Sequence, residues 1–228
     1  MLPRRREPNG AHVIRVLAIF GVTLGAFTLV AQASLGAQPD TATQNVTIFA
    51  RPTVVGWAEG ATLYGTAEGA RAQDLVTVQV RECGSGFFRT YVEAHANAGG
   101  GWLAPVGTAI TSTFRAVWRD TSSPHVTIRQ RASVLLERRR SGTGFTVAVA
   151  AKRSFWRKGV QIQRRQRGSW RTVKTVVLSD SVSSTGVVSF SEATFRLSLP
   201  RGAILRALLP SSQAKPCYVS SVSRTLRT

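Results

Sequence analysis

The sequence predicts an all-β protein made of two tandem seven-stranded β-sandwiches. From residue 46 onward, short runs with period-two alternation, rich in Val, Thr and aromatic residues, are separated by Gly, Pro and Ser clusters. No stretch keeps a helical period for three turns. In addition, residues 160–178 (VQIQRRQRGSWRTVKTVVL) repeat residues 78–91 (VQVRECGSGFFRTY). Both copies have the pattern of a β-hairpin, so the mature chain is expected to contain the same unit twice.

The repeat has an offset of 82 residues, and five identical or similar pairs define it. They are Gln79 and Gln161, Val80 and Ile162, Gly86 and Gly168, Arg89 and Arg171, and Thr90 and Thr172, with Phe88 falling on Trp170.

The N-terminus has the three parts of a secretory signal. Arg4 to Arg6 are positive, residues 16–30 are mostly apolar, and Ala31-Gln32-Ala33 is a small-x-small cleavage site. We expect a signal peptide at 1–33 and a flexible leader at 34–45. An uncleaved membrane anchor and twin-arginine export are the alternatives, although the apolar run is shorter than the ~20 residues that span a bilayer. The mature chain contains no second apolar run, so we expect it to be secreted or associated with the cell envelope without a transmembrane segment.

Seven strands are expected in each unit, from the same alternation. The first unit, 46–131, has predicted strands at 46–57, 61–67, 75–82, 87–95, 102–106, 112–118 and 125–131. The second, 132–228, has them at 134–138, 145–152, 160–164, 170–178, 187–199, 204–209 and 218–226, with about nine extra residues near 179–186 or 194–202. Parity places the following side chains inside: Val76, Val78, Val80, Phe114, Ala116, Trp118, Phe145, Val147, Val149, Val160, Ile162, Leu205, Ala207 and Leu209.

Two such units behind a signal peptide resemble the immunoglobulin-like or fibronectin-III-like modules of exported bacterial surface proteins. The resemblance covers nearly the whole mature chain, but each unit has one Cys and lacks the inter-sheet Cys and Trp pattern of antibody domains. Modules of this class act as spacers, adhesive units or ligand-binding domains, and the fold alone does not choose among them.

The two cysteines are predicted to form a disulfide that joins the units. An exported chain with two cysteines favours a bond over free thiols. In this connectivity Cys83 lies at the exit end of the first sandwich and Cys217 at the entry end of the second, and the two ends abut. Free or separately paired thiols are the alternative, and a metal site with two distant cysteines would be incomplete.

Positive charge is concentrated in the second unit. Residues 34–131 contain 8 basic and 7 acidic residues, whereas residues 132–228 contain 18 basic and 3 acidic, a net of +15. The first and third turns of a sandwich share one end, so their arginines are expected to form a patch for anionic polymers. The basic residues between them, 152–158, are expected at the opposite end, near the joint between the units. Trp156 and Trp170, each beside an arginine, could stack on sugars or bases, and packing within the hairpin is the alternative for Trp170. A basic surface that reflects genomic base composition is the alternative. The predicted patch residues are Arg138, Arg139, Arg140, Arg164, Arg165 and Arg167.

Motifs for catalysis are not found. The sequence contains no G-x-S-x-G, H-E-x-x-H, P-loop or G-x-G-x-x-G pattern in a suitable context, and no cofactor or metal is expected. The predicted function is therefore an exported, non-catalytic envelope module that contacts an anionic polymer. One alternative is a spacer that binds a surface protein through an edge strand. A more distant one is a carbohydrate-active enzyme that uses two of Glu137, Asp180 and Glu192.

Overall fold

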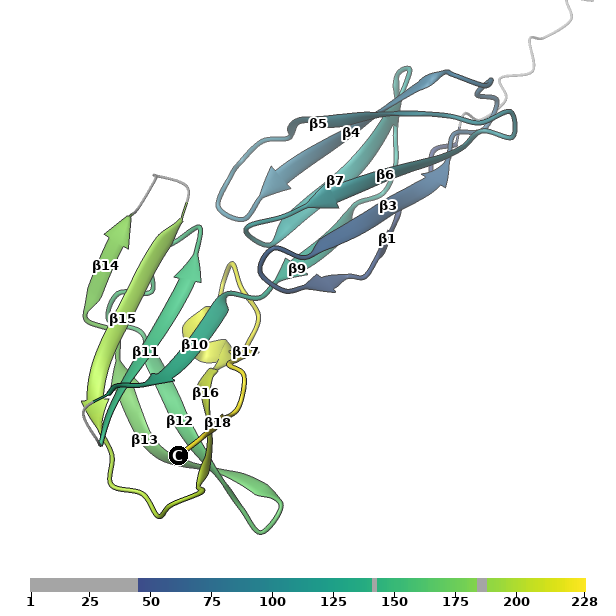
Figure 1. The fold of residues 1–228 in the computed structure, drawn as a ribbon. Coiled ribbons are helices and arrows are strands. Elements are labelled where there is room, and N and C mark those ends of the chain that lie inside the picture. The colour runs from purple at the N-terminus through teal and green to yellow at the C-terminus, as the bar shows by residue number, and fades with distance from the viewer. Residues whose placement is uncertain (1–44, 141–142, 184–187) are drawn as a thin grey trace, which may run out of the picture. The chain divides into compact units, whose positions relative to one another are not determined.

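A computed structural model describes residues 45–140, 143–183 and 188–228, which lie in one compact unit. The predicted signal peptide and almost all of the predicted leader lie outside the described residues. The described chain is all-β: it forms strands in four antiparallel-dominated sheets, together with one short helical turn, α1 (Ser211–Ala214) (Figure 1). Within these residues, no helix has the length and apolarity needed to cross a membrane.

The N-terminal half forms a three-stranded and a six-stranded sheet that enclose one hydrophobic core. The smaller sheet has the order β1-β3-β6, and the larger has the order β2-β9-β7-β4-β5, with β8 paired to β7. All six inward positions predicted for this half are buried. The strands are β1 (Phe49–Arg51), β2 (Val54–Val55), β3 (Gly60–Thr66), β4 (Leu75–Glu82), β5 (Arg89–His95), β6 (Gly101–Gly107), β7 (Ser112–Trp118), β8 (Thr121–Ser122) and β9 (Val126–Gln130).

The C-terminal half repeats this layout with a four-stranded and a five-stranded sheet around a second core. The orders are β10-β11-β15-β14 and β13-β12-β16-β17, with β18 also paired to β16. The eight inward positions predicted here are buried as well. The strands are β10 (Ser133–Arg138), β11 (Gly144–Ala151), β12 (Gly159–Gln166), β13 (Ser169–Val177), β14 (Asp180–Ser183), β15 (Ser189–Arg196), β16 (Ile204–Leu209), β17 (Ser221–Val222) and β18 (Leu226–Arg227).

The predicted count of seven strands in each half needs correction. The expected strand at 46–57 is divided into β1 and β2, because Pro52 has no N–H to continue the ladder; β2 instead pairs in parallel with β9. The expected strand at 218–226 is divided into β17 and β18. The short strands β8 and β14 were not predicted. β14 lies in the region 179–186, where the sequence placed part of the extra residues of the second unit.

The hairpins from which the sequence predicted a repeat are aligned correctly on one strand only. Opposite Thr90 lies Gln79, and opposite Thr172 lies Gln163, so the second strand keeps the offset of 82 while the first has an offset of 84. Each ladder has an irregularity directly before this glutamine. The second hairpin is therefore two residues shorter. The predicted equivalence of Gln79 and Gln161 is wrong by two residues, because the structure aligns Gln79 with Gln163. A shift of two residues preserves which side chains face inward, so the burial pattern did not reveal the error.

In each half, a buried serine makes a pair of hydrogen bonds to the backbone of a neighbouring strand. The Ser123 hydroxyl accepts from the Ala116 N–H at 2.9 Å, and the Ser123 N–H donates to the Ala116 carbonyl at 2.8 Å. Ser223 makes the corresponding two bonds with Ala207, both at 2.9 Å. The sequence hides this correspondence, because 7 residues separate the first pair and 16 the second. The longer connection of the second half contains α1 and Cys217.

Candidate functional site

The basic residues of the C-terminal half are segregated by sheet. The strands of the β13-β12-β16-β17 sheet, including β18, contain six basic residues and no Asp or Glu. The described carboxylates of this half, Glu137 and Glu192, belong to β10 and β15 of the opposite sheet. The β13-β12-β16-β17 sheet is therefore positively charged, and its own strands contain no carboxylate that would offset this charge. Its basic strand residues are Arg164, Arg165, Arg171, Lys174, Arg206 and Arg227.

Arg206 is the centre of the outer surface of this sheet. Its neighbours Leu205 and Ala207 are fully buried, so alternation directs Arg206 outward. Its guanidinium Cζ lies 4.2 Å from the Trp170 ring centroid, and its Nε donates to the Gln163 Oε1 at 2.8 Å. Stacking and this hydrogen bond hold the guanidinium in place while its Nη groups remain available for a ligand.

Further arginines surround this stack. Arg165 lies directly opposite Trp170 in the β12–β13 ladder and is exposed, as is Arg227 on β18. We call the outer surface defined by Arg165, Trp170, Arg206 and Arg227 the arginine face. Arg206 and Arg227 were absent from the predicted patch. The sequence contained a signal for Arg206, which is a basic residue between the apolar residues of an alternating strand. Arg227 lies on a two-residue strand, one position beyond the predicted strand 218–226.

The β12–β13 hairpin extends the arginine face with a two-residue turn (Figure 1). Arg167 and Gly168 both have positive φ, +48° and +83°, which is the geometry of a type I′ turn. This turn exposes Arg167, and the ladder places Arg164 directly opposite Arg171. Like charges in direct register destabilise a ladder. Arg164 also lies opposite the buried Leu205 in the β12–β16 ladder, so alternation directs this pair to the other side of the sheet from Arg165 and Arg206, and it is not part of the arginine face.

The other predicted patch residues lie on the opposite sheet or beyond it. Arg138 ends β10 and lines a hollow of about 310 Å³ together with Arg201 and Thr228. Arg139 and Arg140 follow it and are exposed. Their predicted convergence with the hairpin arginines into one patch stays a prediction.

The two tryptophans proposed for stacking differ in their surroundings. Trp156 is 52% exposed, and the Arg157 guanidinium lies 4.2 Å from its ring centroid. Trp170 is half-buried beneath Arg206. Trp170 therefore supports the arginine face and has little free surface for stacking. The Trp156 ring is more exposed, although Arg157 lies beside it.

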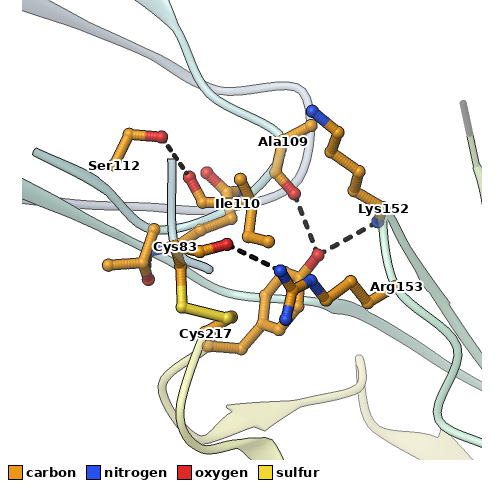
Figure 2. Close-up of a disulfide and its surroundings, with 10 residues drawn as sticks. Cys83, Ala109, Ile110, Ser112, Lys152, Arg153 and Cys217 are labelled. Carbon is orange, nitrogen blue, oxygen red and sulfur yellow. Dashed lines mark hydrogen bonds between the residues drawn. A yellow bond between two sulfur atoms is a disulfide. The ribbon is translucent and has the colours of Figure 1, made fainter. Parts of the chain in front are cut away.

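The predicted disulfide between Cys83 and Cys217 is confirmed. The two Cα atoms are 5.4 Å apart, and the bond spans 134 residues (Figure 2). It links the turn after β4 to the segment after α1. Packing accompanies it, because Ile110, from the β6–β7 connection, is buried in the core of the C-terminal half.

Polar contacts complete this joint. The buried Tyr218 hydroxyl donates to the Ala109 carbonyl at 3.1 Å and accepts from the Lys152 N–H at 3.0 Å. Burial raises the pKa of this hydroxyl above its ordinary value. Arg153 donates to the Cys83 carbonyl at 2.8 Å. The basic cluster that begins at Lys152 thus serves the joint, as its predicted position near the interdomain connection implied.

Glu82 adds ion pairs at the joint. Its carboxylate accepts from the Lys152 ammonium and, at 3.0 Å, from the Arg89 guanidinium. The hydrogen bond from Lys152 holds the pKa of Glu82 below its ordinary value, and partial burial opposes this effect. The lowered pKa favours the ionised form of Glu82, which is the form that pairs with Lys152 and Arg89. The joint thus combines a disulfide with hydrogen bonds, ion pairs and buried apolar contacts.

The three carboxylates weighed for catalysis lie on the strands of one sheet, β10-β11-β15-β14. Glu192 lies opposite Asp180 in the β14–β15 ladder, while Glu137 lies on β10 opposite Thr146. For Asp180, the structure describes the backbone alone. Among the described residues, no group of three His, Cys, Asp or Glu has the arrangement of a metal site.

Comparisons with known proteins give little guidance. No family model matches the sequence, and no curated protein is significantly similar to it. Among solved structures, the chain is similar to the purple acid phosphatase PPD1 from yellow lupin (Lupinus luteus) seeds, with a TM-score of 0.36 and 10% identity. The match covers 81% of this chain and 41% of the phosphatase, so this chain spans less than half of that protein's length. Neither fold nor activity is inferred from it.

Proposed function

We propose that this protein is an exported, non-catalytic tandem immunoglobulin-like module of the cell envelope that binds an anionic polymer through the arginine face. The observation that carries the proposal is a sheet with six basic residues and no carboxylate on its strands, in the half with a net charge of +15. Phosphate- or carboxylate-bearing wall polymers, acidic polysaccharides and released DNA have the complementary charge.

The strand orders support the immunoglobulin-like assignment. In each half, one sheet contains the first strand and strands from before and after the hairpin (β1-β3-β6 and β10-β11-β15-β14). The other sheet contains the hairpin together with the last strands, as in a Greek-key sandwich. The disulfide supports an oxidising compartment, which agrees with the predicted signal peptide. The equivalent hydrogen bonds of Ser123 and Ser223 support a duplicated unit.

The geometry of the arginine face also supports a polymer ligand. The Arg206 guanidinium, which Trp170 and Gln163 hold in place, loses little conformational entropy on binding. The face is a sheet surface and not a closed pocket, so it suits an extended chain with repeated charges. Such binding decreases steeply with salt, because each contact releases condensed counterions.

Binding measured at several salt concentrations tests the proposal. The probes are lipoteichoic acid, heparin and double-stranded DNA, compared with the neutral polymer dextran. The triple variant R165Q/R206Q/R227Q is expected to reduce the slope of log K against log salt by about 2 to 3. The control R71Q/R196Q/K215Q removes the same charge from exposed positions elsewhere and should leave most of the affinity. Equal losses in the two variants would indicate a general charge effect and reject a dedicated face.

A second candidate function is binding of a surface protein by strand addition. The edge strand β13 pairs with β12 alone and has nine residues, with Val177 58% exposed. A free strand edge is a template for another chain. Retention of one envelope protein at high salt, lost in a variant with Pro at Thr175, would favour this function over polymer binding.

A further inference from the structure

The N-terminal half has its own cluster of hydrogen-bond donors, on the outer surface of β4, β7 and the start of β9. The Phe88 ring lies across this surface. The Arg81 Cζ is 4.8 Å and the Arg115 Cζ 4.5 Å from the centroid of this ring. The His125 ring is 5.1 Å away, centroid to centroid. One aromatic side chain thus gathers three nitrogen-bearing groups that sequence analysis left unassigned.

The two guanidinium groups are close and fixed. Because their distances to the ring centroid add to 9.3 Å, the two Cζ atoms are no farther apart than that. The Arg115 Nε donates to the Gln79 Oε1 at 2.8 Å, which leaves its Nη groups free of described partners. A guanidinium carbon lies roughly 4 Å from the central atom of an oxyanion that it binds, so one tetrahedral anion bridges two arginines whose Cζ atoms are about 8 Å apart, a separation that the upper limit of 9.3 Å allows.

No carboxylate neutralises this pair. In the described residues, the ion pairs are those that Glu82 forms with Arg89 and Lys152 at the joint. Neither Arg81 nor Arg115 takes part in them. Two neighbouring positive charges repel each other, and stacking on Phe88 offsets only part of that repulsion. A bound anion would supply the missing counter-charge.

Hydroxyl groups adjoin the arginines. Thr113 lies opposite Arg81 in the β4–β7 ladder and opposite Thr127 in the β7–β9 ladder, and their Oγ1 atoms are 3.1 Å apart. In the C-terminal half, the equivalent ladder positions hold Ile204 and Arg227. The N-terminal surface therefore combines two charges with neutral donors, which suits one discrete anionic group better than a polyanion.

We propose that Arg81, Arg115, Thr113, Thr127 and His125 form a binding site for a single oxyanion, built on Phe88. The ligand class is a sulfate, a phosphate monoester or a carboxylate, either free or carried by a saccharide. This site is separate from the arginine face, and its occupation does not depend on polymer binding there. The nearly neutral N-terminal half would thus bind one anionic group selectively, whereas the basic C-terminal half attracts anionic polymers in general.

The test is a titration of the purified protein followed by NMR of the arginine Nε–H groups and by calorimetry. The probes are sodium sulfate, sodium phosphate, glucosamine 6-sulfate and galacturonic acid, each compared with sodium chloride at equal ionic strength. Saturable shifts of the Arg81 and Arg115 signals are expected with the oxyanions and not with chloride. Tighter binding of the saccharide than of its free anion would indicate a carried group, and equal binding a free one.

Variants distinguish this site from the arginine face. R81Q and R115Q are each expected to weaken oxyanion binding at least tenfold, while R71Q, in the same half, leaves it unchanged. R115K retains the charge and the fold but loses the planar fork, and should weaken binding several-fold. R165Q/R206Q/R227Q should bind the single oxyanions normally. Shifts that do not saturate or that chloride reproduces, or full binding by both R81Q and R115Q, would overturn the proposal.

Discussion

Removing the disulfide should destabilise the whole described unit by a large amount. Cys83 and Cys217 close a loop of 134 residues. In the chain-entropy treatment such a closure stabilises the folded state by about 5 kcal/mol at 25 °C. The C83S/C217S variant removes this constraint from the unfolded chain while Tyr218, Arg153 and Ile110 still connect the two halves.

Urea denaturation followed by tryptophan fluorescence measures the effect. With a slope of about 2 to 3 kcal/mol per molar urea for a chain of this size, the midpoint is expected to fall by roughly 2 M. Wild-type protein with reducing agent is the control and should behave like the variant. A midpoint within about 0.5 M of the oxidised protein would refute the reasoning that the bond acts on the unfolded chain.

Three further predictions concern single residues. S223A leaves the buried Ala207 N–H without its acceptor and should lower the free energy of unfolding by about 1 to 3 kcal/mol in urea titrations. The control S220A changes an exposed serine and should not lower it. Equal effects of the two variants would contradict the hydrogen bond between Ala207 and Ser223. G168A places a side chain at φ +83°, where the surrounding space is open, so the cost comes from the backbone conformation. The free energy of unfolding should fall by about 1 kcal/mol relative to G86A in thermal unfolding. No difference between the two variants would argue against the type I′ turn. For E82Q, the loss in unfolding free energy should be below about 1 kcal/mol at pH 7. The loss should decrease as pH falls below the unfolded pKa and through the lowered folded pKa, because the carboxylate stabilises the fold only while it is ionised; a loss independent of pH would exclude the ion pairs as its cause.

Much of the strand framework could be predicted because it depends on local alternation. The predicted bounds of β4, β7 and β16 agree with the structure residue for residue, and the inward positions were correct in both halves. Period-two patterning reports which face is buried and needs no knowledge of the partner strand. The disulfide followed from the same framework, since strand order fixes which ends of a sandwich meet.

Register and side-chain clustering could not be predicted in the same way. The two-residue difference between the hairpins leaves burial parity unchanged, so no pattern within one strand detects it. The predicted patch combined arginines from two turns that were expected at the same end of the sandwich. It therefore did not include Arg206, which contacts Trp170 from another strand, or Arg227 on the short strand β18.

The sequence by itself determined that this chain is all-β, that its charge belongs to one half, and that its two cysteines pair. Each of these depends on composition or on local periodicity, which the chain carries before it folds. Only the tertiary structure decided that the basic residues occupy one sheet while the described carboxylates of that half occupy the other, and that Phe88 gathers Arg81, Arg115 and His125. These arrangements arise between strands that are distant in sequence, and pairing register brings them together.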